Sequence, residues 1–388
     1  MKELSYWQRL FSIVRTKSGL LTVNNHKGVK MKTGRTLGEL AREIERQNET
    51  KKDYVTDTRN ITLISKSNGV GADNQKEKAE EKYRLDLAGV GGFEINDICH
   101  GQIASRLGIP MQYYNRMTKD APSLLQRNVN YWLMQNPEKR MIRTLDGNAR
   151  AFLSNRYRPI DNHDLAGAVL PIIADLGCKI ESCELTERRL YLKCVNTKVE
   201  GEIKPGDRVQ AGVIISNSEV GCGAVRIDPL VYRLVCKNGM IANDFSMRKY
   251  HIGRSGEDFE KEAVTEFYKD ETRLADDRAM LLKVRDVVEG ALSEAIFQQI
   301  VGKMQEAHGI KMKADPVKCV ENVAKKFGFS QEEQSGVLRF LIEGGDLSLY
   351  GVMNAVTRQS QEVADYDRAT DFERFGGQIL DLPQLVTV

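Results

Sequence analysis

One stretch decides how the chain is expected to fold: Met141–Asp164, which reads MIRTLDGNARAFLSNRYRPIDNHD. Two short runs flank the tripeptide Asp146-Gly147-Asn148, and Asp-Gly between alternating runs is a strong signal for a β-hairpin. If the first two residues of the tripeptide form the turn, Arg143 faces Arg150 across the ladder, where like charges are unfavourable. Either an anion lies between the two arginines, or both side chains lie in open water. We take the first as the hypothesis to test.

The hairpin is rich in arginine, and the stretch that follows it adds further cations. Lysine and arginine neutralise phosphates, and aromatic rings stack on nucleobases. The candidate phosphate-binding residues are Arg143, Arg150, Arg156, Arg158, Arg226, Arg233 and Lys237. The candidate stacking residues are Tyr157, Phe152 and Trp132.

The charge of the chain is unevenly distributed along its length. Residues 1–35 carry eight Lys/Arg against one acid, residues 102–158 carry ten against three, and residues 256–388 carry sixteen against twenty-five. A basic body with an acidic last third favours a polyanionic partner. The alternative is that the segments differ in charge without any functional consequence.

Composition and length indicate a globular protein of two or three domains, or one large domain with additions. The chain has 388 residues, of which 41% are hydrophobic and 29% charged. No apolar run approaches the roughly 18 residues of a membrane helix, and the N-terminus does not read as a signal peptide, so we expect a cytoplasmic protein. The seven cysteines form no Cys-x-x-Cys motif, which favours core thiols over disulfides or zinc. We expect neither a metal nor another cofactor.

The order of sequence patterns predicts an α+β fold: a central, mostly antiparallel β-sheet, an N-terminal helical block and an acidic C-terminal helical region. We expect a basic arm over residues 1–30, a helix and a mobile loop over 31–95, an α+β core over 96–255, and helices over 256–388. Capping boxes begin helices at Thr36 and Ser330. Residues 96–136 should form three helices, with Asp97 as the first cap. The apolar pattern of the third helix contains Leu124, Leu125, Val129, Trp132 and Leu133.

Three motifs have a functional interpretation and a structural alternative. Residues 102–117, QIASRLGIPMQYYNRM, suit either a DNA-reading helix-turn-helix or two packed helices joined at Gly108. Residues 217–223, NSEVGCG, suit either a phosphate cradle of backbone amides or a tight turn. His163 between Asp161 and Asp164 suits general acid–base chemistry, whereas the same three residues also suit the start of a helix.

Four stretches together resemble a phage- and plasmid-encoded family built on a domain of unknown function, DUF932. They are RTLDGNARAFLSNRYRPIDNHDL from Arg143, NSEVGCGAVRI at Asn217–Ile227, YRLVCKNGMI at Tyr232–Ile241 and LSLYGVMNAVTR at Leu347–Arg358. The resemblance spans most of Gly34–Leu382 and excludes Met1–Lys30. It implies a role in DNA metabolism or in evasion of host defence, and it brings no agreed catalytic residues.

These observations predict a protein that binds nucleic acid, most specifically one that binds or anneals single-stranded DNA during replication or recombination of a mobile element. By analogy with annealing proteins, we expect a homo-oligomer such as a ring, in the cytoplasm of a bacterial host. The first alternative is an anti-defence or replisome-accessory protein whose acidic last third binds a host protein. The second is a metal-dependent nucleic-acid-processing enzyme centred on His163.

Overall fold

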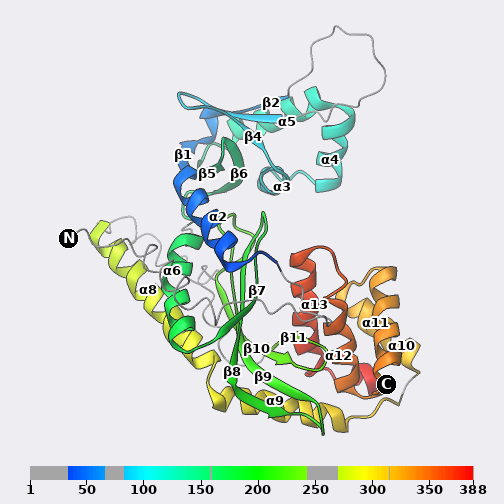
Figure 1. The fold of residues 1–388 in the computed structure, drawn as a ribbon. Helices are drawn as coiled ribbons and strands as arrows, with labels where there is room; N and C mark the ends of the chain where they lie inside the picture. The colour runs from blue at the N-terminus through cyan, green and yellow to red at the C-terminus, as the bar shows by residue number, and fades with distance from the viewer. Residues whose placement is uncertain (1–33, 66–82, 158–159, 243–269, 314, 388) are drawn as a thin grey trace, which may run out of the picture. The chain divides into compact units, whose positions relative to one another are not determined.

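The computed structural model describes residues 34–65, 83–157, 160–242, 270–313 and 315–387 (Figure 1). The chain divides into two compact units: unit 1 contains Met1–Ala41, Ile160–Ser218 and Gly223–Val388, and unit 2 contains Arg42–Pro159 and Glu219–Cys222. This division differs from the four successive segments expected from the sequence. The arginine-rich hairpin and the β-rich stretch that follows it fall in different units.

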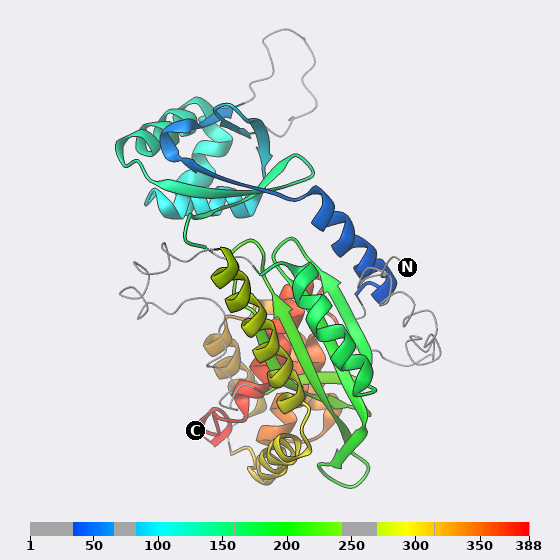
Figure 2. The same cartoon turned by 90° about the vertical axis from the view of Figure 1, so that its left-hand side faces the viewer.

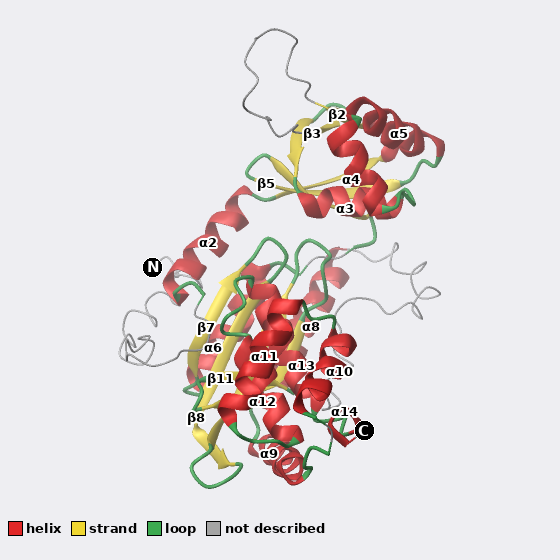
Figure 3. Ribbon diagram, turned by 90° about the vertical axis from the view of Figure 1, so that its right-hand side faces the viewer, coloured by secondary structure: helices red, strands yellow, loops and turns green. Residues whose placement is uncertain are grey.

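Unit 2 is a six-stranded sheet with three helices on one face (Figure 3). The strand order is β1-β5-β6-β4-β3-β2, and the pairs are antiparallel except β4 with β6. The elements are β1 Lys52–Asp57, η1 Thr58–Asn60, β2 Ile61–Ser65, β3 Tyr83–Leu87, β4 Gly91–Ile95, α3 Asp97–Arg106, α4 Met111–Asp120, α5 Pro122–Gln135, β5 Lys139–Leu145 and β6 Asn148–Ser154. Helix α2, Leu37–Thr50, begins in unit 1 and ends in unit 2.

Alternating apolar residues hold the three helices on the sheet. Ile61 and Leu63 of β2, with Leu85 of β3, point to the same face because side chains alternate along a strand. Opposite them, α5 buries Leu125, Val129 and Leu133, while α4 buries Tyr114 and Met117. These residues form the core of unit 2.

Helix α5 also covers the edge of this sheet at β2. The Asn130 side-chain oxygen accepts from the Leu63 amide at 2.7 Å, and its nitrogen donates to the Leu63 carbonyl at 2.9 Å. The Gln126 side chain accepts from the Ser65 amide at 3.0 Å. These bonds satisfy backbone groups that an edge strand would otherwise leave open to pairing with another strand. Helix α5 is therefore held in place by its apolar face, which packs in the core, and by the face that carries Asn130 and Gln126, which bonds to β2. Its remaining face is exposed to solvent.

Unit 1 is a five-stranded antiparallel sheet, ordered β11-β10-β9-β8-β7, between helices. Helices α6 and α8 lie over one face (Figure 2), and α12 and α13 pack from the other side. The strands are β7 Lys179–Leu185, β8 Leu190–Glu202, β9 Arg208–Asn217, β10 Arg226–Arg233 and β11 Asn238–Ile241. The helices are α6 Asn162–Asp175, α8 Asp270–Ala291, α9 Glu294–Gly309, α10 Pro316–Phe327, α11 Gln331–Gly344, α12 Leu349–Gln359, α13 Tyr366–Ile379 and α14 Gln384–Thr387.

The predicted α+β class is confirmed, although there are two sheets rather than one central sheet. The Ser330 capping box is present, as is its counterpart at Thr36, whose hydroxyl and amide both bond the Glu39 carboxylate. The cap of α3 is Asn96 rather than the expected Asp97. The predicted arm over residues 1–30 lies outside the described residues, as do residues 66–82 of the segment predicted to contain a mobile loop. Of the helices that are described, none has the length and apolar character to cross a membrane.

Candidate functional site

The arginine-rich hairpin forms where the sequence predicts it, but its register differs. Strands β5 and β6 are joined at Asp146 and Gly147, whose φ angles of 51° and 78° suit a tight hairpin turn. Arg143 pairs with Ala151 and Thr144 pairs with Ala149, so Arg150 is the extra residue of a β-bulge. The prediction that Arg143 faces Arg150 is therefore wrong.

The anion between the two arginines is supplied by the protein itself. Arg143 Nε donates to Asp53 Oδ1 at 2.8 Å, and Arg143 Nη1 donates to the Glu219 carbonyl at 3.0 Å. Arg150 Nη2 donates to Glu219 Oε2 at 2.8 Å. All four residues belong to unit 2, because Glu219–Cys222 packs with that unit. We call Asp53, Arg143, Arg150 and Glu219 the arginine cluster.

The arginine cluster is part of the interior of unit 2. The Arg143 side chain is 0% exposed, and those of Arg150 and Glu219 are 11% and 6% exposed. Val220, next in the chain, is also buried, and its carbonyl accepts from the Gln102 side chain at 2.7 Å. The NSEVGCG stretch therefore packs against the hairpin at Glu219 and Val220. Neither Arg143 nor Arg150 presents its guanidinium to solvent, where a nucleic-acid phosphate would lie.

The other candidate cations that the structure describes are divided between the two units. Arg156 is exposed in unit 2, whereas Arg158 lies outside the described residues. Arg226, Arg233 and Lys237 belong to unit 1. Arg226 pairs with Asp228 at 3.4 Å, and Arg233 donates to both carboxylate oxygens of Asp207 at 2.5 and 2.7 Å. Lys237 is half-buried in a turn, with φ at 50°.

Among the three candidate stacking residues, only Trp132 is exposed. Phe152 lies in the core, and Tyr157 is half-buried against the cluster of Ala151, Leu153 and Val220. Burial raises the pKa of the Tyr157 hydroxyl. Trp132 is 42% exposed on α5.

Trp132 has an aromatic neighbour, Tyr131, that is not among the residues predicted to stack on bases. Tyr131 is 57% exposed, and the two ring centroids lie 5.2 Å apart in an edge-to-face arrangement. A signal for Tyr131 was present in the sequence. Once Leu125, Val129 and Leu133 occupy the core face, helical periodicity places Leu124, Arg127, Tyr131 and Met134 on the opposite side.

The His163 region forms the start of α6, as its structural interpretation predicts. Asp161 is the N-cap residue and Asp164 lies in the first turn. His163 Nδ1 lies 3.2 Å from Asp164 Oδ1, and the Asp164 side chain is 61% exposed. Within the described part of the chain, no three His, Cys, Asp or Glu side chains are grouped so that they hold a metal ion.

Helices α3 and α4 are joined by a short turn containing Gly108, whose φ is 66°. Ile103 and Ala104 of α3 and Tyr114 and Met117 of α4 are buried in the core of unit 2, which fits two packed helices. The outward residues of α4 include Tyr113, Arg116 and Lys119. The structure therefore offers an exposed α4 beside an exposed face of α5.

The family model described as "Domain of unknown function (DUF932)" matches residues 151–374, which is more than half of the chain. The match covers all five strands of unit 1, and it begins after α4 and α5 of unit 2. No curated protein and no solved structure matches the chain. Over this region the chain belongs to the DUF932 family.

Proposed function

We propose that unit 2 binds single-stranded nucleic acid, and single-stranded DNA in particular, through the outward residues of α4 and α5. We call these residues the α4–α5 surface: Tyr113, Arg116, Lys119, Leu124, Arg127, Tyr131, Trp132 and Met134. The observation that carries the proposal is the exposed Tyr131–Trp132 pair beside Arg127. Proteins that bind single strands combine aromatic platforms for the bases with cations for the backbone.

The apolar part of the surface is a stripe on α5. Leu124, Tyr131 and Met134 are 39%, 57% and 54% exposed, and Arg127 lies between the first two on the same side of the helix. A surface helix normally turns charged or polar residues toward solvent. Large side chains gathered on an outward face indicate a binding surface.

The charge of the surface favours an anionic partner, such as a nucleic-acid backbone. Residues 111–136 contain the three cations Arg116, Lys119 and Arg127 against the single acid Asp120. Among the residues that the structure describes, none forms a salt bridge with Lys119 or Arg127 within 4.0 Å. Arg116 makes only a long contact of 3.8 Å with Asp120, and its side chain is 77% exposed. All three charges are therefore available to phosphates at little cost.

The biological setting is part of the same proposal. We infer a role in replication or recombination of a phage or plasmid, as the family resemblance implies, with a homo-oligomer such as a ring carrying many copies of the surface along one strand. An assembly of this kind would multiply weak individual contacts into tight binding. The mass of the assembly in solution, with and without oligothymidine, tests this part separately.

The binding test is fluorescence anisotropy with a labelled oligothymidine over a series of salt concentrations. Stacking is worth about 1–3 kcal/mol per base, so Tyr131→Ala/Trp132→Ala should raise Kd by roughly 10- to 100-fold. Arg127→Gln should make the salt dependence of binding weaker. The negative slope of log association constant against log salt concentration should become shallower by about 0.7, the value for one phosphate of a single strand. Ile342→Ala removes a 65% exposed apolar side chain from unit 1 and serves as the control.

Two results would overturn the proposal. One is unchanged affinity in the double aromatic variant, and the other is no binding to any oligonucleotide at about 50 mM salt. In the second case the exposed aromatic pair becomes a candidate anchor for a protein partner, because Tyr, Trp and Arg also dominate protein interfaces.

A further inference from the structure

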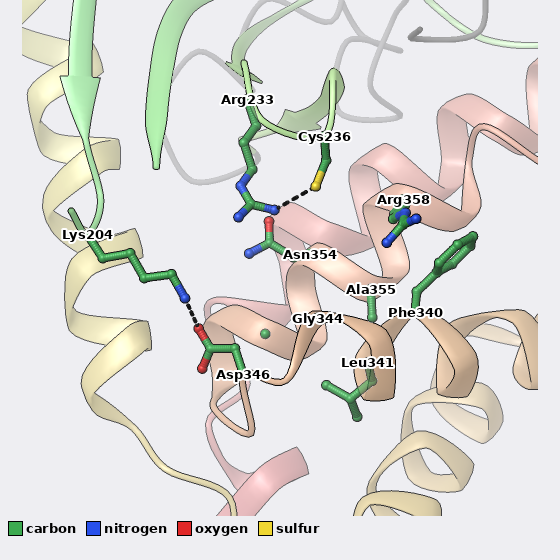
Figure 4. A pocket seen from close by; sticks show the side chains of 11 residues that line it. Lys204, Arg233, Cys236, Phe340, Leu341, Gly344, Asp346, Asn354, Ala355 and Arg358 are labelled. Atoms are coloured by element: carbon green, nitrogen blue, oxygen red, sulfur yellow. Dashed lines mark hydrogen bonds and ion pairs between the residues drawn. The ribbon is translucent and has the colours of Figure 1, made fainter. Parts of the chain in front are cut away.

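Unit 1 contains a pocket whose lining includes one of the cations predicted to bind nucleic acid, Arg233 (Figure 4). Its space of about 380 Å³ is open to solvent. It is built from the turn after β8, the end of β10, the end of α11 and one face of α12. The lining residues are Lys204, Arg233, Cys236, Phe340, Leu341, Gly344, Asp346, Gly351, Asn354, Ala355 and Arg358.

The pocket has an excess of positive charge in its lining. Three of the eleven lining residues are cations, and Asp346 is the single acid among them. Lys204 Nζ and Asp346 Oδ2 are 2.8 Å apart and neutralise each other. Arg233 and Arg358 pair with acids outside the lining, Asp207 and Glu343, and Glu343 is the more exposed of these two acids.

Asp207 holds the Arg233 guanidinium rigidly, and one of its nitrogens remains for a ligand in the pocket. Its Nε and Nη2 are engaged by Asp207, and the buried Tyr350 hydroxyl donates to the same carboxylate at 2.8 Å. Although burial disfavours the charge, the hydrogen bond to Asp207 raises the pKa of Arg233. The remaining nitrogen, Nη1, donates to Cys236 Sγ at 3.2 Å. A thiol sulfur is a weak acceptor, so an anionic oxygen would be a better partner for this charged donor.

Arg358 is the more adaptable of the two arginines. It lies over the Phe340 ring at 4.4 Å and contacts Glu343 at 3.2 Å. The Glu343 side chain is 45% exposed, and ion pairs of this kind are worth little in water. A ligand anion can therefore replace Glu343 while the stacked ring keeps the guanidinium in place. Asn354 lies one helical turn before Arg358 on α12, below the Arg233 guanidinium in Figure 4.

We propose that this pocket binds a small ligand through a phosphate or carboxylate group held by Arg233, Asn354 and Arg358. The apolar part of the ligand packs against Leu341 and Ala355, which complete the wall. Arg358 has a planar guanidinium that suits oxyanions, and Arg233 adds its remaining nitrogen, Nη1. This site is independent of the α4–α5 surface, because all of its residues belong to unit 1.

The test is thermal unfolding of the full chain at constant ionic strength, with sodium phosphate, a nucleoside monophosphate or succinate replacing chloride. A ligand that binds only the folded state raises the Tm with a saturating dependence on its concentration. At least one of the three compounds should raise the Tm of unit 1 in this way. A response to all three indicates recognition of the anionic group alone, whereas a response confined to one compound identifies the ligand class.

Two arginine variants separate binding in the pocket from a general charge effect. Arg358→Gln should raise the apparent Kd for the stabilising compound at least tenfold. Arg339→Gln is the matched control, because Arg339 also lies over the Phe340 ring, at 4.6 Å, but does not line the pocket. The control should change Kd by less than about twofold, a difference of roughly 0.4 kcal/mol. No rise in Tm with any compound, or equal effects of the two variants, would overturn the proposal.

Discussion

Because the arginine cluster is buried, we predict that removing its Glu219 charge lowers the stability of unit 2. Glu219→Gln removes the charge that neutralises Arg150 and keeps the backbone carbonyl that binds Arg143. Breaking a buried ion pair by removing one partner costs about 3–5 kcal/mol, because the other charge is left unpaired. The two side chains are 11% and 6% exposed, which is close to that buried case. Because the Gln amide oxygen can still accept from Arg150, we expect a value near the lower end, about 3 kcal/mol.

The assay is urea unfolding followed by tryptophan fluorescence. The chain has two tryptophans, Trp7 and Trp132, so a Trp7→Phe background leaves the signal of Trp132 on α5 as a reporter of unit 2. With an m-value of about 2 kcal/mol/M, the loss corresponds to a midpoint lower by roughly 1.5 M urea. Asp120→Asn is the control, since it breaks a pair with Arg116 whose side chains are 69% and 77% exposed.

The control should cost less than about 0.5 kcal/mol, as exposed pairs of i,i+4 spacing do. The reasoning is refuted if Glu219→Gln costs no more than this control. That result would mean that solvent screens Arg150, and the hairpin would again be a candidate phosphate-binding face.

Two further predictions concern other buried polar groups. Burial lowers the pKa of His100 to about 4, so the unfolded state, with a pKa near 6.5, takes up the proton first as the pH falls. The free energy of unfolding of unit 2 should therefore decrease by about 3 kcal/mol between roughly pH 6.5 and pH 4, and His100→Gln should flatten this dependence in urea melts. In unit 1, Lys193 Nζ lies 2.6 Å from Glu373 Oε2 with both side chains 1% exposed. Lys193→Met alone should cost about 3–5 kcal/mol, whereas Lys193→Met/Glu373→Leu should recover most of it. Because Trp132 reports on unit 2, these melts are followed by far-ultraviolet circular dichroism, and no recovery would contradict the pairing.

Features set by neighbouring residues were predictable from the sequence. The hairpin turn needs positive φ angles that Asp146 and Gly147 adopt at 51° and 78°. The capping box at Ser330 depends only on Glu333, three residues later. Local patterns of this kind also located the three helices between residues 96 and 136. The class of the fold followed from these elements.

Local sequence patterns could not predict the register of the hairpin or the burial of its two arginines. The acid that pairs with Arg150 is Glu219, which lies 69 residues later in the chain. The sequence showed two like charges that needed an anion, but it contained no signal for which acid would supply it. A pattern that assumes regular alternation of side chains along a strand cannot predict the β-bulge at Arg150.

The candidate binding surface was only partly predictable. Leu124 and Trp132 were assigned to the apolar pattern of the third helix, yet they are 39% and 42% exposed. The core face of α5 consists of Leu125, Val129 and Leu133. Leu124 lies on the opposite side of the helix, whereas Trp132, seven residues after Leu125, lies at the margin of the core face and stays partly exposed. Trp132 was also considered for base stacking because of its ring. Its pairing with Tyr131 required the structure.

The most direct test of the central claim is ultraviolet cross-linking of the protein to single-stranded oligothymidine, followed by tryptic digestion and mass spectrometry. We expect adducts on the peptide Asn128–Lys139, which contains Tyr131 and Trp132. Adducts confined to other peptides, such as the one that carries Tyr157 beside the hairpin, would contradict it.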